Sequence, residues 1–184
     1  MPTRNPLSIV EKCKKGDEKA FAILCEENYD FAYRIAFRML AHEEDVKDVV
    51  QEAFIKVWKN ICSYNEQVKI TTWLYSIVTN LCIDRLRKRK NHADILCEEA
   101  LGKVNLTNEE EQLEKKDLAA IITCIAKHLS PKQHAIFVLR DLEGLDMEEI
   151  SRITQLPASR VKSNLCHARK AIREKLVKNY KVEY

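Results

Sequence analysis

Apolar residues between Val46 and Ile61 recur in steps of three and one, which is the spacing of a single helical face. A β-strand alternates every second residue, so this segment cannot form a strand. The 184-residue chain contains only three glycines and four prolines, which argues against sandwiches, barrels and glycine-rich nucleotide loops. We therefore expect an all-α protein with one or two small domains.

Helix start signals mark several further elements. Asp17 predicts the N-cap of a long helix that reaches about Leu40. Ser130-Pro-Lys-Gln133 combines an N-cap serine, a proline at the first helical position and a capping-box glutamine. Asp146 starts a short helix, which Gln155-Leu-Pro157 ends. The helix that follows should bury Val161, Leu165, Ala168, Ile172 and Leu176.

The middle of the chain suggests a domain boundary. Thr71 or Thr72 predicts the N-cap of a helix that ends in the basic run near Lys90. The residues after it lack a sustained period until a possible capping box at Thr107 and an apolar stripe over residues 118–129. We expect one domain over residues 1–92, a flexible acidic linker over 93–111, and a helix-turn-helix domain over 112–184.

The distribution of charge is more informative than the net charge of +3. Residues 1–92 carry net +3, residues 93–118 net −5 and residues 119–184 net +5, so two basic segments flank an acidic one. Within the basic segments, the cations cluster in residues 85–90 and 160–178. Clusters of this kind attract phosphate backbones, which favours a nucleic-acid partner.

Catalytic, metal and membrane functions find little support in the sequence. The seven cysteines form no C-x-x-C pair, and no set of residues has zinc-ligand spacing, so we expect no disulfide framework, metal or cofactor. No nucleophile elbow or phosphate-binding loop occurs, and we expect no enzyme. The longest uncharged stretch, residues 70–83, is too short and polar to insert in a membrane, and the first residues lack a signal sequence. A cytoplasmic protein is expected.

The last helix is a candidate for reading DNA. A short helix, a tight turn and a longer basic helix form a helix-turn-helix pattern, although many small bundles contain such a corner. The outward side chains can contact base edges and phosphates. Alternatively, they form only a solvated surface. They are Ser159, Arg160, Lys162, Ser163, Asn164, His167 and Lys170.

Two further surfaces allow more than one interpretation. On the helix from Val46, acids including Asp48 and Glu52 share a polar ridge bordered by Gln51, which is either a solvated face or a docking site for a basic partner. No neighbouring ligand set supports acid–base or metal chemistry there. Between Cys62 and Lys90, aromatic residues precede Asn80 and the basic run. They suit unstacked bases, but they could equally fill the core.

Three motifs together resemble the extracytoplasmic-function (ECF) sigma factors of bacterial RNA polymerase. They are Asp48-Val-Val-Gln-Glu-Ala-Phe54, Thr72-Trp-Leu-Tyr-Ser-Ile-Val-Thr-Asn80, and Val161-Lys-Ser163 through Ala168-Arg169. The resemblance covers roughly residues 17–90 and 113–176. It implies a subunit that binds core RNA polymerase and directs it to specific promoters.

The resemblance also assigns roles to residues. Helices of the largest catalytic subunit would be bound by Asp48, Gln51 and Glu52. The polymerase partner would comprise the largest and second-largest catalytic subunits. The second domain would read the minus-thirty-five element through the outward residues of the last helix. An anti-sigma factor would sequester the free protein. The minus-ten element would be recognised and opened by Tyr64, Lys69, Trp73, Tyr75, Asn80, Arg85, Arg87 and Lys88.

Some positions depart from the family pattern. Many members have Gly-Thr where this chain has Ser159-Arg160, and arginine where Asn164 and His167 stand. The promoter sequence therefore cannot be inferred from relatives. A free-standing helix-turn-helix activator is the main alternative function, and a helical adaptor for acidic proteins is a second. The activator gives the Trp73–Asn80 segment no role, and the adaptor leaves the base-reading residues of the last helix unexplained.

Overall fold

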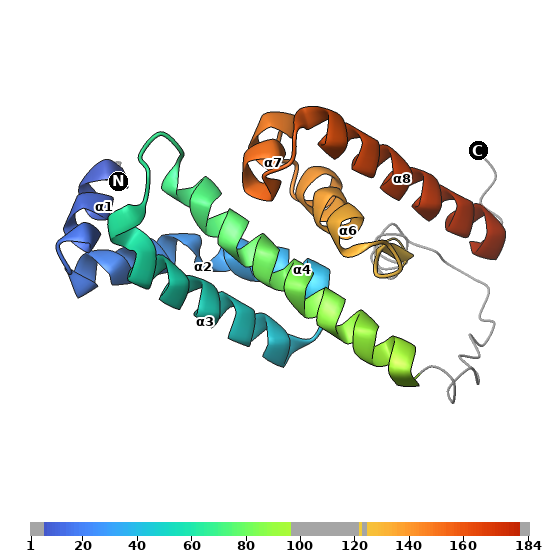
Figure 1. Ribbon diagram of the computed structural model, residues 1–184, viewed down its shortest axis with the longest axis horizontal. Coiled ribbons are helices and arrows are strands. Elements are labelled where there is room, and N and C mark those ends of the chain that lie inside the picture. The colour runs from blue at the N-terminus through green and yellow to red at the C-terminus, as the bar shows by residue number, and fades with distance from the viewer. Residues whose placement is uncertain (1–5, 97–121, 123–124, 181–184) are drawn as a thin grey trace.

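The computed structural model describes residues 6–96, 122 and 125–180, and every regular element among them is helical (Figure 1). The all-α class is confirmed, in two helical domains. The elements are α1 (Pro6–Lys14), α2 (Glu18–Leu40), α3 (Glu43–Asn60), η1 (Ile61–Ser63), α4 (Ile70–Leu96), α6 (Pro131–Phe137), η2 (Val138–Leu142), α7 (Met147–Thr154) and α8 (Ala158–Tyr180).

In the first domain, α2, α3 and α4 pack against one another, with α1 at one end (Figure 1). The expected cap of α2 is confirmed, because the Asp17 carboxylate accepts hydrogen bonds from the backbone amides of Lys19 and Ala20 at 3.0 Å. The stripe that begins at Val46 is buried along α3 as its period predicted, except that Trp58 is half-exposed.

Two elements of this domain differ from expectation. Helix α1 was not predicted, yet Ile9, Val10 and Cys13 are buried against the bundle. Helix α4 begins at Ile70, so the expected cap position, Thr71 or Thr72, lies inside its first turn. It also continues past the basic run to Leu96, into the segment assigned to the linker. The rest of the linker and the Thr107 signal lie outside the described residues.

The second domain follows its sequence signals closely. Ser130 and Gln133 form the reciprocal capping box, and the Asp146 side chain caps α7. Helix α6 runs into the π-helical turn η2, which ends just before Gly144. Gln155 adopts a left-handed conformation (φ 54°) at the turn between α7 and α8. All five residues expected to face inward from α8 are buried.

The two domains pack directly against each other. Helix α4 lies against α6 and α7, and η2 lies against α2, so that one buried apolar cluster spans both domains. Polar contacts cross the same boundary. The Glu143 side chain is 5% exposed and forms ion pairs with Arg38 at 3.1 Å and Arg34 at 3.6 Å. The Arg38 guanidinium also donates to the backbone carbonyl of Leu142.

A buried histidine lies where the domains meet. His134 on α6 is 1% exposed, and its Nε2 has no hydrogen-bond partner. Burial lowers the pKa of His134 from 6.5 to about 4, assisted by Lys127 and opposed by a hydrogen bond to the backbone of Arg38. The folded protein therefore holds this imidazole neutral at pH values where the unfolded chain would protonate it.

This difference predicts acid sensitivity. The unfolded chain takes up the proton near pH 6.5 and the folded chain only near pH 4, so stability falls as the pH drops through that window. Between pH 7 and pH 5 we expect a loss of ~2 kcal/mol in the free energy of unfolding, measured by urea titration. His134→Leu should remove most of this pH dependence, whereas His128→Leu, at an exposed site, should retain it. Equal pH dependence in His134→Leu and the parent would contradict the assignment.

Candidate partner-binding and nucleic-acid interfaces

The acidic ridge of α3 divides into an inner and an outer part. Asp45 is only 18% exposed at its side chain and binds Arg85 at 3.0 Å and also Arg89, which ties α3 to α4. Asp48 and Glu52 point outward, with side chains 64% and 46% exposed. Gln51 between them is also exposed. The predicted ridge also included Lys59, which is exposed. A partner can therefore reach the three residues of the expected polymerase contact, whereas Asp45 is largely covered.

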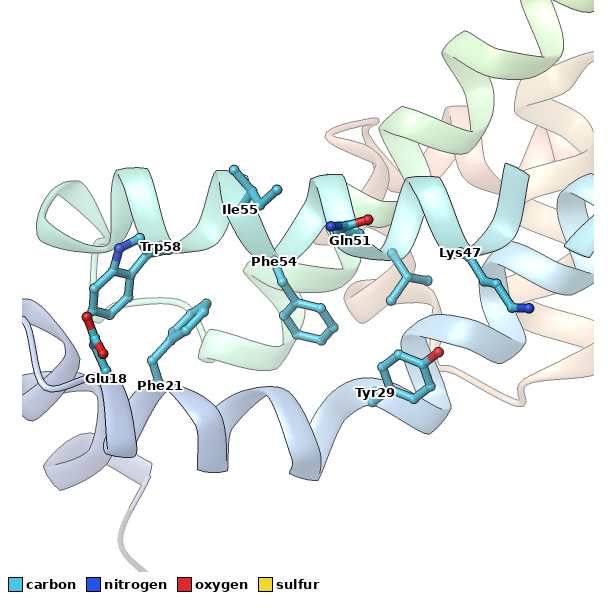
Figure 2. Close-up of a pocket in the computed structure, with 9 residues that line it drawn as sticks. Glu18, Phe21, Tyr29, Lys47, Gln51, Phe54, Ile55 and Trp58 are labelled. Carbon is cyan, nitrogen blue, oxygen red and sulfur yellow. The ribbon is translucent and has the colours of Figure 1, made fainter. Parts of the chain in front are cut away.

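Beside these residues lies an apolar pocket that sequence analysis missed. It has a volume of about 600 Å³ and opens between α2 and α3. Figure 2 shows the rings of Phe21 and Trp58 at one end, Tyr29 and Lys47 at the other, and Phe54 between the helices. The Phe21 and Trp58 centroids are 4.8 Å apart. Gln51 lines the pocket as well, so the pocket and the polar residues form one continuous surface.

Exposed apolar side chains extend this surface. Ile55 on α3 is 45% exposed, although the helical stripe assigned its neighbours to the core. Along α2, the rings of Tyr29, Tyr33 and Phe37 stack at centroid distances of 5.9 and 6.1 Å. Tyr29 and Phe37 are more than 40% exposed. Three aromatic residues at i, i+4 and i+8 were the sequence signal for this row, and adjoining exposed apolar groups are typical of interaction sites.

The aromatic residues expected to contact the minus-ten element are mostly internal. Tyr64 is 7% exposed, its hydroxyl donates to the Val68 carbonyl, and its ring lies 5.2 Å from Trp73. Tyr75 is 9% exposed and donates to Asn28 at 3.2 Å. Burial raises the pKa of both phenols. In this conformation neither tyrosine presents a ring face to a base, and only Trp73 is half-exposed.

The remaining minus-ten candidates lie on or near the surface. Lys69, Asn80, Arg87 and Lys88 are exposed, whereas Arg85 is half-buried in its ion pairs with α3. Arg87 binds Asp84 one turn away at 3.1 Å. Asn80 lines a crevice between the domains, together with Lys132, Thr154 and Leu156 of the second domain.

The outer face of α8 carries the expected row of polar side chains. Ser159, Arg160, Lys162, Ser163, His167 and Lys170 are exposed, opposite the buried stripe. Asn164 is half-buried, and its amide donates to the Arg160 carbonyl at 2.8 Å. Arg169 binds Asp141 on η2, with its Nε 2.9 Å from the carboxylate. The side-chain hydrogen bond to Asp141 raises the pKa of Arg169. This ion pair fixes the middle of α8 to the rest of its domain.

The described residues provide no support for other kinds of site. None of their helices is long and apolar enough to cross a membrane. In the same part of the chain, no group of three or more His, Cys, Asp and Glu side chains is arranged to hold a metal ion.

Comparison with known proteins places the chain in one family. Sigma-70 region 2 matches residues 24–92, and Sigma-70 region 4 matches residues 119–172. The ECF RNA polymerase sigma factor SigW of Bacillus subtilis is 33% identical, over 91% of this chain and 94% of the relative. The ECF RNA polymerase sigma-E factor of Haemophilus influenzae is 32% identical, over 92% and 94%.

Solved structures agree at the level of the fold. CnrH, in complex with the cytosolic domain of CnrY, has a TM-score of 0.68 at 19% identity, covering 95% of this chain and 98% of that chain. The sigma factor RpoE from Bartonella quintana, in complex with the anti-sigma factor NepR, has a TM-score of 0.64 at 19% identity, covering 88% and 99%. Matches to both sigma regions in the correct order, together with relatives aligned over nearly the whole chain, show that this protein belongs to the ECF sigma factors of RNA polymerase.

Proposed function

We propose that the chain binds core RNA polymerase in the bacterial cytoplasm and directs it to promoters, as a regulatory subunit rather than an enzyme. Residues 1–92 would bind polymerase and open the minus-ten element, residues 93–111 would link the domains, and residues 112–184 would read the minus-thirty-five element. The observation that carries the proposal is the presence of two distinct exposed surfaces. One is an apolar pocket between α2 and α3 with exposed acids nearby on α3, and the other is a cationic row on α8.

The α3 surface suits a helix of the largest catalytic subunit. An apolar pocket between two helices accepts the apolar side of a partner helix, and the exposed acids on either side of Gln51 can bind basic residues of that partner. Ile55 and Trp58 would supply the apolar contact, while Asp48 and Glu52 would guide the approach of the partner. Affinity and orientation would thus come from adjacent groups on one helix.

Energetics require such a partner. Separating about ten DNA stacking steps costs roughly 14 kcal/mol at ~1.4 kcal/mol per step. Each base captured on an aromatic or amide group returns only about 1–3 kcal/mol. Asn80 and Trp73 can therefore trap one or two unstacked bases but cannot open the duplex alone. A large polymerase that grips both strands would supply the remainder.

Helix α8 would read the minus-thirty-five element in the major groove. The exposed hydroxyl, imidazole and cationic groups of its first three turns can reach base edges and phosphates, while the buried stripe holds the helix in its domain. Asn164 would have to release its hydrogen bond to Arg160 before it could read a base. Its half-buried position makes it the weakest candidate of the row.

Replacement of the α8 cations should weaken minus-thirty-five binding. For Arg160→Ala with Lys162→Ala, we expect the salt dependence of duplex binding to fall by about one per lost phosphate contact, with ~1–3 kcal/mol lost per base contact. Lys178→Ala, an exposed cation near the end of α8, serves as the control. Fluorescence anisotropy with a mapped promoter duplex at several salt concentrations gives both quantities. If binding by parent and variant depends identically on salt concentration, these cations contact solvent rather than DNA.

Promoter recognition requires the domains to separate. The centres of the two promoter elements lie roughly 25 base pairs apart, about 85 Å of B-DNA. Asn80 and Leu156, which directly precedes the turn into α8, line the same crevice here. The two reading surfaces are therefore far too close for simultaneous contact. Fully extended, the proposed linker over residues 93–111 could span at most about 68 Å. The distances from its ends to the two reading surfaces would supply the rest of the separation.

The packed arrangement also suits sequestration by an anti-sigma factor. The structural relatives CnrH and RpoE were solved in complex with the cytosolic domain of CnrY and with the anti-sigma factor NepR. We infer that an anti-sigma factor holds this chain with its domains together, and that release precedes binding to polymerase.

In-vitro transcription with purified core RNA polymerase over a fragmented genomic library tests the proposal. We expect new start sites that share a minus-ten and a minus-thirty-five element and that disappear without this protein. Binding to DNA without binding to core polymerase would instead support the free-standing activator.

A further inference from the structure

The end of α1 contacts the loop between α3 and α4. Lys14 is the last residue of α1, and its ammonium group lies 2.7 Å from the Glu66 carboxylate. The same group lies over the Tyr64 ring, 5.8 Å from its centroid. The backbone carbonyl of Lys14 accepts a hydrogen bond from the Cys62 thiol at 3.7 Å. One residue therefore holds three positions of the loop, from about fifty residues away in sequence.

The loop is also organised internally. The Tyr64 hydroxyl donates to the Val68 carbonyl, which closes the segment on itself. The Asn65 side chain accepts a hydrogen bond from the backbone amide of Gln67 at 3.0 Å. The Tyr64 ring packs on Trp73, which links the loop to the first turns of α4. A displacement of Tyr64 would therefore move Trp73, the half-exposed aromatic residue of the proposed minus-ten surface.

Lys14 also affects the charge of the loop. Glu66 is the only acid between Cys62 and Lys69, and its side chain is 47% exposed. A carboxylate in a loop that approaches DNA repels the phosphate backbone unless a cation is close to it. Lys14, whose side chain is 27% exposed, is the cation beside this carboxylate. Without it, the loop would present an uncompensated negative charge to the promoter.

We propose that Lys14 is a positioning residue for minus-ten recognition, which holds the Cys62–Val68 loop in the ordered conformation described above, with Tyr64 packed against Trp73, and neutralises Glu66. The proposal rests on the promoter-reading function above. Lys14 acts through Glu66 and Tyr64 and need not contact DNA. Helix α1, which carries no promoter-reading residue of its own, thereby gains a role in specificity.

The experiment combines this protein with core polymerase on a mapped promoter and on a panel of minus-ten base substitutions. Lys14→Met removes the cation, and Glu66→Gln removes its partner. The double variant completes a double-mutant cycle, which measures the coupling between the two residues. Lys14→Arg preserves the charge. Lys15→Met removes a neighbouring exposed lysine and is the matched control. The readouts are the rate of open-complex formation, the ratio of rates on preferred and substituted promoters, affinity for core polymerase, and thermal stability.

For Lys14→Met, we expect about five-fold slower opening and a similar loss in the promoter ratio, from one ion pair and one cation–π contact. Affinity for core polymerase should not change, and thermal stability should fall only slightly, because a surface ion pair contributes little to the free energy of unfolding. Lys14→Arg should stay within about two-fold of the parent, since arginine retains both contacts. In the Glu66→Gln background, Lys14→Met should cost only about two-fold, because the ion pair is already absent.

Three results would overturn the proposal. An equal effect of Lys14→Met in both Glu66 backgrounds, with a smaller salt dependence, would identify Lys14 as a direct phosphate contact. Equal behaviour of Lys14→Met and Lys15→Met would show that the effect comes from the loss of one positive charge and not from the position of Lys14. Loss of core affinity and stability in step with the promoter ratio would identify a structural role. If the parent binds core polymerase but does not distinguish minus-ten bases, the proposed function itself fails at that element.

Discussion

Charge reversal of Asp48 and Glu52 together should weaken binding to core RNA polymerase by about 100-fold, or ~2.7 kcal/mol. Both carboxylates are exposed on α3. They flank Gln51, which lines the apolar pocket, so a helix bound in the pocket would lie near them. A lysine at either position would repel the basic groups that the carboxylates attract. Each like-charge contact at an interface costs up to several kcal/mol, so two reversals can account for the loss.

The fold should tolerate both changes. The ion pair of Glu52 with Lys56 (3.0 Å) and that of Asp48 with Arg85 (3.8 Å) lie at the surface, where such pairs contribute ~1 kcal/mol or less. Asp45 keeps its contacts to α4 and therefore the packing of α3. A thermal melt followed by circular dichroism should show a nearly unchanged midpoint.

Equilibrium binding to fluorescently labelled core polymerase measures the effect. Glu11→Lys with Glu148→Lys reverses two exposed acids on other helices and changes the net charge equally. Binding like the parent is expected for this control. If Asp48→Lys with Glu52→Lys also binds like the parent, the ridge is only a solvated face and polymerase must dock elsewhere.

Local signals predicted most of the helical framework. Asp17, Ser130 and Asp146 act as caps because a short polar side chain needs only its own next turn to satisfy free amides. The buried faces of α3 and α8 could be predicted from the spacing of apolar residues, because each helix buries one continuous face. Helix α1 has nine residues, and its start signal, Asn5 followed by Pro6 at the first helical position, was overlooked in the sequence. Its burial depends on the bundle that receives it.

Long-range packing determined what the sequence could not predict. Tyr64 is internal because Trp73 and Lys14 cover it, and neither relation has a local signature. Asp45 and Asp48 were placed on one ridge, yet Asp45 pairs with both Arg85 and Arg89 of α4 and is 18% exposed at its side chain. Within the described helices, Asp48 pairs with Arg85 alone, at 3.8 Å, and its side chain is 64% exposed. The pocket near Ile55 depends on the distance between α2 and α3. The domains meet through buried apolar residues. The helical period of these residues is explained equally well by a core within a single domain, so the contact could not be predicted from the sequence.

Glu143→Gln should favour separation of the domains and strengthen apparent binding to core polymerase by about 5- to 10-fold. The Glu143 carboxylate on the second domain is the shared ion-pair partner of Arg34 and Arg38 on the first. Glutamine preserves the shape but removes the charge, and a contact to a charged group contributes ~1.5–3 kcal/mol when well aligned. The buried Oε1 of Glu143 accepts no aligned hydrogen bond, so we expect a smaller contribution than this, about 1 kcal/mol.

The direction of this effect distinguishes a domain contact from ordinary stabilisation. If polymerase binds only the separated form, the apparent dissociation constant equals the intrinsic one divided by the fraction that is separated. A variant that loosens the packing should therefore bind polymerase more tightly although it has lost a native contact. Small-angle scattering should show a larger radius of gyration at the same time, with unchanged helix content.

Asp141→Asn provides the matched control, because Asp141 lies in the same turn but pairs with Arg169 of its own domain. It removes an equal charge without touching the boundary between the domains, so its scattering and its affinity for polymerase should match the parent. If Glu143→Gln lowers the melting temperature without changing either quantity, the carboxylate stabilises the packed form but does not limit access to polymerase. The release step would then depend on the apolar contact of α4 with α6 and α7, which spans more residues than the ion pairs and would need a partner protein to open it.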